Sequence, residues 1–407
     1  MDLTYRWKTS EGSKKRQQIL EALVRGDTDW SKYLVGLSGT SEVTNGLDLR
    51  GIDLNHQDLR KAHLDRVHLE NADLSGANLS GISLKYACLR EANLSEVQLS
   101  GANITGSDLE SCRLVDAKLD GIIGKGARLS HCVAQRLDLH GAQISGTDFR
   151  NTLLDGANLE EVNANFASFA NVSARNLRAA RGQFKKTSWY KANLVDSDFS
   201  DAALTEADLS MVVSHNAKYC RAELSCAKMQ DAKLDGADLS EMTAEGVTFS
   251  NAVVSKASFV KANLNEANLN NTTTPDGAAD FSQIQAEHAF FLNARLPKCR
   301  FDGAMLSRAV LCESDLSHGS LIGARLDAFN GQKANLRDAD LSNAVLSGSN
   351  LSEVDLSNAI LRGAVVKPAE SVQARFERVQ IEDARVSRLL EERLEMSHVV
   401  GTPIYED

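Results

Sequence analysis

Large apolar side chains recur at every fifth position along most of the chain. A step of five residues from Leu49 to Thr274 meets mostly leucine or another bulky apolar residue, and the step resumes from Phe281 to Val386. Two residues before each such position the side chain is usually small, as at Ala72 and Ala77 in the segment NADLSGANLS. This period fits neither a helix, at about 3.6 residues, nor a strand, at about 2. The pattern predicts a repeat fold whose units each bury one large and one small side chain.

The step of five misses a bulky residue at several positions of the first block, and two places among them are of interest. Gly124 occupies a position where leucine is expected, which predicts a slack or bulged coil. Within residues 171–194, Ala174 and Ala179 occupy large positions and Leu177 a small one. This segment is expected to be either a distorted coil or a docking site.

Two extra residues enter the repeat between Leu269 and Phe281, within the segment NNTTTPDGAAD. Turn-forming residues predict a loop there. The loop residues that are candidates for binding a protein are Thr273, Pro275, Asp276 and Gly277.

The two ends of the chain carry helical patterns in place of the repeat. Residues 1–45 contain Ile19, Leu20, Leu23 and Val24 at helical spacing, followed by Trp30, Tyr33, Leu34 and Leu37 at i, i+3, i+4 and i+7. Because an open solenoid exposes its last coil, we expect these helices to cap it. Residues 387–407 predict a short helix and a tail. The apolar side of that helix, which either caps the solenoid or pairs with a second copy, consists of Leu389, Leu390, Leu394 and Met396.

The tandem A(D/N)LXX units resemble the pentapeptide-repeat family over roughly residues 46–386. The resemblance implies an all-β solenoid, a right-handed quadrilateral β-helix with four five-residue sides per coil. It implies about 17 coils, stacked about 4.8 Å apart, with the large and small residues inward and the other three outward. The expected parts are an N-terminal cap at 1–45, a first block at 46–270, a loop with frame shift at 271–280, a second block at 281–386, and a C-terminal helix and tail at 387–407.

Composition and charge narrow the class of protein. The formal net charge of −10 disfavours direct binding to nucleic acid. Seven cysteines without a CxxC pair argue against a disulfide framework and a zinc module. The N-terminus lacks a signal-peptide pattern, and no apolar run approaches the roughly 20 residues of a membrane span. We expect a cytoplasmic protein that does not enter a membrane.

Catalytic and cofactor motifs are missing from the sequence. It contains no P-loop, dinucleotide fingerprint or HExxH motif, and the many aspartates before the leucines are expected on an exposed wall without a cleft. The sequence therefore predicts no enzyme, no cofactor and no metal. Cys112 and Cys132, one coil apart at small positions, are expected to pack in the core, with a redox or metal role as the alternative. His63 and His68 are expected on the solvated surface.

The charge is unevenly distributed along the chain. Acidic residues outnumber basic ones in residues 45–120 and 193–270, whereas basic residues outnumber acidic ones in residues 121–190. We expect a docking surface for an acidic protein partner in this basic part. Its candidate residues are Arg175, Arg178, Arg181, Lys185, Lys186 and Tyr190.

These features favour a non-enzymatic protein-binding scaffold, a rigid acidic rod that docks a partner through outward residues and loops. The family resemblance adds a second hypothesis, a DNA-mimicking modulator of DNA gyrase or topoisomerase that gives resistance to gyrase poisons. Acidity, a loop and an apolar C-terminal helix fit this hypothesis, whereas the length, the helical N-terminus and the basic segment depart from it. A third hypothesis is a secreted effector that acts on host proteins. A homodimer through the C-terminal helix is left open.

Overall fold

The computed structural model describes residues 4–37, 47–395 and 397–406, in two compact units, Met1–Ala203 and Leu204–Asp407. The first unit begins with helices α1 (Tyr5–Lys8) and α2 (Ser10–Arg25) and the 3₁₀ helix η1 (Trp30–Leu34). The second ends with β1 (Val365–Val366), β2 (Arg385–Ser387), η3 (Arg388–Leu390), α3 (Glu391–Glu395) and β3 (Ile404–Glu406). None of the helices in these described ranges is long and apolar enough to cross a membrane.

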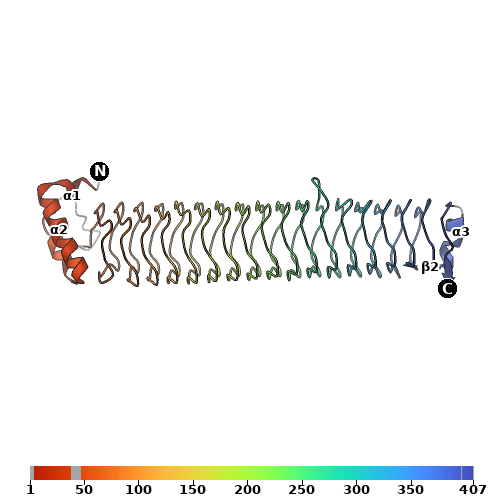
Figure 1. The fold of residues 1–407 in the computed structure, drawn as a ribbon, viewed down its shortest axis with the longest axis horizontal. Coiled ribbons are helices and arrows are strands. Elements are labelled where there is room, and N and C mark those ends of the chain that lie inside the picture. Colours follow the sequence, from red (N-terminus) through yellow and green to blue (C-terminus); the bar gives the residue numbers. More distant parts are fainter. Residues whose placement is uncertain (1–3, 38–46, 396, 407) are drawn as a thin grey trace. The chain divides into compact units, whose positions relative to one another are not determined.

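Parallel backbone bridges between residues 20 apart build the remainder of each unit. Asp48 bridges His68, and His68 bridges Cys88 in the following coil. The next bridge positions lie five residues further along, as in the pairing of Asp53 with Asp73. Each coil therefore has four sides, in agreement with the β-helix that the family resemblance implies (Figure 1).

Burial and hydrogen bonding explain why the sequence winds in this way. Leu74 and Ala72 are buried, with exposed fractions of 0% and 1%, and the Leu74 amide donates to the Asn93 carbonyl in the next coil at 2.8 Å. Buried backbone groups are thus satisfied between neighbouring coils. Corner residues such as Asn71 (φ 60°) adopt the left-handed conformation, which favours glycine, asparagine and aspartate.

Gly124 lies in a regular coil, so the expectation of a slack or bulged coil is wrong. Its amide donates to the Gln143 carbonyl at 2.8 Å, and the adjacent Ile123 bridges Gln143. A Cβ at position 124 would meet Ile144 at 3.2 Å and Ile104 at 3.3 Å. Isoleucines of the coils on either side occupy the volume that a leucine would fill.

Residues 171–194 also keep the regular bridging, so the distorted coil expected there is wrong. Ser173 bridges Asn193 at the usual spacing of one coil. Phe169 stacks on Phe149 and on Trp189, with ring centroids 5.0 and 4.1 Å apart, and Phe184 meets Trp189 edge to face at 5.6 Å. These fully buried rings fill an interior in which Ala174 and Ala179 supply little volume.

The two extra residues near position 275 form a loop that stands out from the coils of the second unit (Figure 1). Bridges across it join residues 22 apart, such as Thr273 and Arg295. The Asp276 amide donates to Oγ of Ser255 at 3.1 Å. Gly277 has a φ of 138°, a conformation that L side chains rarely adopt.

The N-terminal helices contact the first coil. The N-cap of helix α2 is Thr9, whose hydroxyl accepts from the Gly12 amide, and its C-cap is Gly26 in the left-handed conformation. Arg16 donates from Nε to the Asp53 carbonyl at 2.8 Å. The second predicted helix is shorter than its pattern, because η1 ends at Leu34. Residues 1–3 and 38–45 of the predicted cap lie outside the described residues.

Candidate interaction surface

The structure distributes the predicted basic residues around one coil. Each side of this coil begins at a bridge position. Arg175 lies on the side of Ser173, and Arg181 lies on the next side with Arg178, which is itself a bridge position. Lys185 and Lys186 lie on the side of Gln183, and Tyr190 lies on the side of Ser188. The six residues therefore lie on four successive sides. A flat partner cannot contact all of them at once.

Two of these arginines are neutralised by ion pairs with acidic side chains. Arg178 pairs with Glu160 at 3.3 Å and Arg181 with Glu161 at 3.1 Å. Both carboxylates belong to the preceding coil, so the basic coil is partly neutralised by its neighbour. The Tyr190 ring lies 5.1 Å from the Lys191 ammonium and is half-buried.

Between residues 83 and 186, one side of the first unit carries lysines and aromatic residues and no acidic residue, while Asp65 of the preceding coil borders it and accepts from the Lys85 amide at 2.8 Å. This side, here called the Tyr86/Phe166 side, follows the series of bridge positions from Ser83 to Gln183, one in each coil. It comprises each of these residues and the outward residues two and three positions after it. None of its outward positions between residues 83 and 186 is aspartate or glutamate. Its exposed cations are Lys85, Lys125, Lys185 and Lys186.

Large apolar side chains lie exposed on the same side. The exposed fractions are 58% for Tyr86, 63% for Phe166 and 46% for Ile123. Tyr86 and Phe166 occupy left-handed corner positions, with φ of 58° and 63°. Gly106, one coil after Tyr86, has the same conformation. A bulky residue at such a corner costs backbone free energy of roughly 1 kcal/mol. The guanidinium carbon of Arg66 lies 5.3 Å from the centroid of the Tyr86 ring and covers part of it.

Arginines on the other sides of this unit are largely paired. Arg136 and Asp116 form a 2.6 Å ion pair between successive coils, and Arg150 and Asp148 form one of 2.7 Å on a single side. On the Tyr86/Phe166 side, by contrast, Lys85 and Lys125 have no ion pair within the described part of the chain. A surface with exposed aromatics and with the lysines Lys85 and Lys125 outside any ion pair is suited to binding an acidic, partly apolar partner.

The predicted loop candidates belong to the second unit. Thr273 is half-buried, Pro275 and Asp276 are exposed, and Gly277 accepts from the Lys256 amide at 3.1 Å. The structure therefore assigns the loop and the basic coil to different units.

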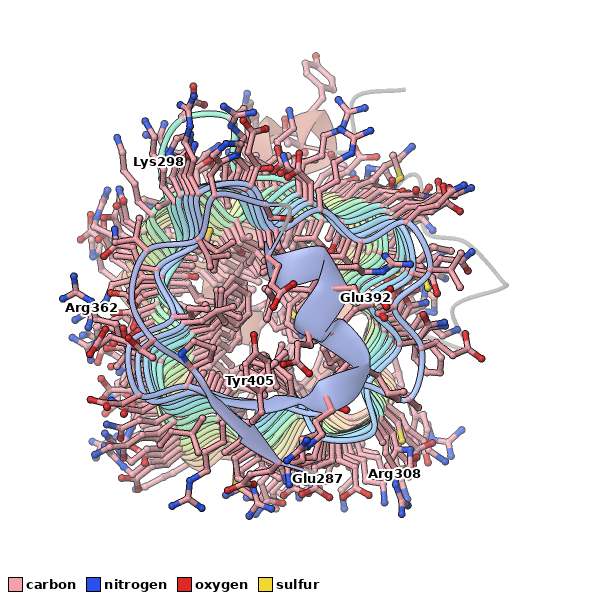
Figure 2. All side chains as sticks on the ribbon, turned by 90° about the vertical axis from the view of Figure 1, so that its right-hand side faces the viewer. Glu287, Lys298, Arg308, Arg362, Glu392 and Tyr405 are labelled. Atoms are coloured by element: carbon pink, nitrogen blue, oxygen red, sulfur yellow. The ribbon has the colours of Figure 1, made fainter. Side chains whose placement is uncertain are left out.

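The C-terminal candidates separate into buried and exposed residues. Leu390 and Leu394 have exposed fractions of 0% and 2%, whereas Leu389 is 81% exposed. Met396 lies outside the described residues. Nearby, β1, β2 and β3 form a parallel sheet in which Val365 pairs with Arg385, and Arg385 with Ile404. Figure 2 shows α3 and Tyr405 at this end, while the labelled Lys298, Arg308 and Arg362 extend outward.

Models of known protein families give one clear match. The model of pentapeptide repeats matches in eight copies, which together cover more than half of the chain. The chain belongs to the pentapeptide-repeat family. The matched residues are 48–85, 77–116, 112–151, 142–177, 245–273, 278–317, 294–330 and 332–366. The predicted family and its right-handed β-helical solenoid are thus confirmed.

Solved pentapeptide-repeat structures resemble this chain at low identity. HetL from the cyanobacterium Nostoc sp. strain PCC 7120, involved in heterocyst differentiation regulation, is 21% identical over 68% of this chain and 90% of its own, with a TM-score of 0.24. Trypsin-treated QnrB1, a plasmid-mediated fluoroquinolone resistance protein, is 18% identical over 50% and 96%, with a TM-score of 0.23. Rfr23 from the cyanobacterium Cyanothece 51142 is 24% identical over 34% and 89%, also at 0.23. No protein in the search of curated sequences matched.

Cysteines at the small positions of this pentapeptide-repeat protein lie in the core. Cys112 and Cys132 are buried, and their thiols donate to the carbonyls of Leu89 and Leu109 at 2.8 and 3.0 Å. Burial raises the pKa of the Cys132 thiol to about 12. These contacts favour the core-packing interpretation of the pair.

The expectation of a solvated His68 is wrong. His68 is half-buried, with a side-chain exposure of 29%, and its Nδ1 lies 3.0 Å from Oε1 of Glu70. Cys88 of the next coil completes a group of three side chains whose ligand atoms lie within 4.8 Å of one another. His63, in contrast, is exposed as predicted.

Sequence reasoning missed Tyr86, Phe166 and the His68 group because it followed positions along the chain and not across coils. Tyr86 and Phe166 are 80 residues apart, which is four coils of 20 residues. His68 and Cys88 are one coil apart. Writing the pentapeptide repeats in rows of 20 would have aligned both sets.

Proposed function

We propose that this pentapeptide-repeat protein is a non-enzymatic scaffold that binds an acidic protein segment along the Tyr86/Phe166 side. The observation that carries this proposal is the exposure of Tyr86 and Phe166 on the side described above, which carries no acidic residue between residues 83 and 186. At about 4.8 Å per coil, the two rings lie roughly 19 Å apart. A short extended or helical segment with two apolar anchors spans that distance.

Charge and apolar area supply complementary parts of the binding free energy. Lys85 and Lys125 attract acidic side chains and speed encounter, an effect that salt weakens. Covering a largely exposed aromatic ring contributes about 1.5–3 kcal/mol. We therefore expect the aromatics to set the affinity, and the lysines to set the preference for acidic sequences.

The electrostatics of the carboxyl groups support a non-catalytic protein. Hydrogen bonds from Arg60 lower the pKa of Asp58 to about 2. The pKa values of Asp29, Asp58, Asp116, Asp148 and Glu406 lie below the ordinary carboxyl value. A general acid at neutral pH needs a raised pKa instead.

An array of immobilised peptides tests the binding proposal. The array holds acidic peptides with two leucines or phenylalanines, the same acidic peptides with serine in their place, and basic peptides. We expect the full chain to bind the first class best, and binding to fall as NaCl rises. Replacing Tyr86 and Phe166 together by asparagine should weaken binding about 10- to 100-fold, because asparagine keeps the corner conformation and removes the rings.

Matched charge reversals locate the surface. Lys85→Glu with Lys125→Glu changes the Tyr86/Phe166 side, whereas Arg113→Glu with Arg175→Glu makes the same charge change on another side of the same unit. We expect only the first pair to abolish the preference for acidic peptides. Equal loss in both pairs would show nonspecific attraction to net charge and would contradict the proposal.

The DNA-mimicking gyrase modulator is the second candidate. The net charge of −10 supports it, but Arg90 and Arg128 both pair with Glu110, at 2.9 and 3.0 Å, so part of the acidic surface is neutralised. A supercoiling assay with purified DNA gyrase and a fluoroquinolone tests this candidate. Unchanged gyrase inhibition at saturating protein would exclude it. The secreted effector remains a hypothesis without a specific structural observation in its favour.

We also propose that the terminal helices cap the solenoid of about 17 coils. At the N-terminus, the Trp7 indole donates to the Arg50 carbonyl at 2.8 Å, and the Trp30 indole donates to the His63 carbonyl at 3.2 Å. These bonds satisfy carbonyl groups at the edge of the first coil, which would otherwise be open to pairing with another chain.

A further inference from the structure

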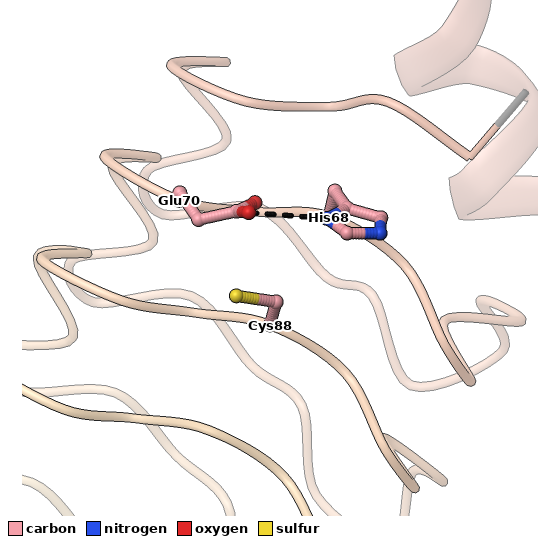
Figure 3. Close-up of side chains that lie close together, drawn as sticks. All are labelled: His68, Glu70 and Cys88. Carbon is pink, nitrogen blue, oxygen red and sulfur yellow. Dashed lines mark hydrogen bonds and ion pairs between the residues drawn. The ribbon is translucent and has the colours of Figure 1, made fainter. Parts of the chain in front are cut away.

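Three potential metal ligands from two neighbouring coils converge near the N-terminal end of the first unit (Figure 3). His68 and Cys88 are bridge partners one coil apart, and Glu70 follows His68 on the same side. Their ligand atoms, an imidazole nitrogen, a carboxylate oxygen and a thiol sulfur, all lie within 4.8 Å of one another. The side chains are half-buried, with exposed fractions of 29% for His68 and 20% for Glu70.

Glu70 has an unsatisfied oxygen in this group. Its Oε2 is buried and has no hydrogen-bond partner, whereas Oε1 lies 3.0 Å from His68. The arginines of the flanking coils pair elsewhere: Arg50 with Asp48 at 2.8 Å, and Arg90 with Glu110 at 2.9 Å. A buried carboxylate oxygen without a partner is costly, and a cation between Glu70 and Cys88 would remove that cost.

We propose that His68, Glu70 and Cys88 bind a Zn²⁺ ion that joins two successive coils. Zinc accepts nitrogen, oxygen and sulfur ligands together, at about 2.0–2.3 Å in tetrahedral geometry. Ligand atoms in such a site are about 3.3–3.8 Å apart, so side-chain rotation has to shorten the widest separation by about 1 Å. The partial exposure of the group leaves water as the fourth ligand.

Binding requires the release of a proton from Cys88. Zn²⁺ replaces the thiol proton: the S–H bond breaks, a Zn–S bond forms, and H⁺ leaves to the solvent.

The chain contains histidine–carboxylate pairs that serve as internal comparisons. His215 lies 3.1 Å from Asp235, and His318 lies 3.7 Å from Asp338, each across one coil. Within the described residues, only the His68 group adds a third ligand of this kind. A metal bound at the proposed site therefore gives a thiolate-to-metal absorption band, whereas a metal bound at these pairs does not.

Titration of the full chain with Co²⁺, followed by displacement with Zn²⁺, tests the proposal. We expect one equivalent of Co²⁺ with a thiolate-to-cobalt absorption band, and loss of the band on addition of Zn²⁺. Cys88→Ser should abolish the band, and Glu70→Gln should weaken binding about 10- to 100-fold. The control Cys226→Ser, which changes an exposed cysteine elsewhere, should behave like the wild type.

Thermal unfolding supplies a second readout. Zn²⁺ that binds only the folded state should raise the unfolding midpoint of the wild type and of Cys226→Ser, but not that of Cys88→Ser. Absence of stoichiometric binding would overturn the proposal. So would a thiolate band that persists in Cys88→Ser.

Discussion

The indole of Trp189 stacks face to face on the ring of Phe169, with centroids 4.1 Å apart and planes inclined by 7°. The two residues lie one coil apart, and both are fully buried. Phe149 extends the stack on the other face of Phe169. A continuous aromatic column thus fills the interior of the coil whose outer surface carries the basic residues.

We expect Trp189→Ala to lower the free energy of unfolding by about 3–5 kcal/mol, because it removes buried area and leaves a cavity. Urea denaturation measures this change. Tyr86→Ala, an aromatic truncation at an exposed position, is the control and should change stability by less than about 1 kcal/mol. Similar losses in both variants would contradict the assignment of Tyr86 to the surface.

Restoring the repeat at Gly124 should destabilise the protein. Gly124→Leu places a side chain where Ile104 and Ile144 already lie 3.3 and 3.2 Å from the point that its Cβ would occupy, and overpacking of this kind costs about 1–3 kcal/mol. Urea denaturation of Ile123→Leu, a change at the exposed neighbouring residue, gives the baseline. A more stable Gly124→Leu would show that the volume is empty.

Replacing Arg6 should loosen the N-terminal helices. Arg6 pairs with Asp48 at 2.7 Å, with side-chain exposures of 5% and 1%, and it donates to the Arg50 carbonyl at 2.9 Å. Asp48 keeps its 2.8 Å pair with Arg50 when Arg6 is replaced, so the cost should lie below the about 3–5 kcal/mol of leaving a buried charge without a partner. We expect Arg6→Met to speed amide hydrogen exchange in α2 and the first coil.

The control for Arg6 is Arg25→Met, which breaks the exposed pair of Arg25 and Asp27. Solvent screens an exposed ion pair, which therefore contributes little to stability, so exchange in α2 should change little. Equal protection in both variants would show that the Arg6 pair does not hold the helices to the coil.

The C-terminal leucines should separate folding from self-association. Leu390→Ala is expected to cost about 2–5 kcal/mol because the side chain is buried. Leu389→Asp should leave the unfolding midpoint unchanged and abolish any dimer that forms through this helix. Sedimentation velocity distinguishes the outcomes: a dimer that persists in Leu389→Asp excludes pairing through Leu389.

Alkylation rates should report the raised pKa of Cys88. Because burial raises its thiol pKa to about 11, only a small fraction is thiolate at pH 8, and that fraction increases about tenfold per pH unit below the pKa. Mass spectrometry after limited iodoacetamide treatment should show slower labelling of Cys88 than of the exposed Cys226. Faster labelling of Cys88 at pH 7 would contradict this environment.

The five-residue step determined the coil. Leucine at every fifth position and a small residue two places earlier, as at Leu74 and Ala72, define which side chains are buried, because burial drives winding in one register. The frame shift near Pro275 and the helical pattern that became α2 were equally local signals. Family, coil and core were therefore predictable from the sequence.

Only the tertiary structure decided which residues lie together across coils. Gly124 seemed irregular along the chain, yet isoleucines of the two adjoining coils lie next to it. Tyr86 and Phe166, like His68 and Cys88, share a side through a spacing of whole coils. Contacts in the interior and on the surface join residues 20 or more positions apart in the sequence. A pattern read over a few neighbouring residues therefore does not predict them.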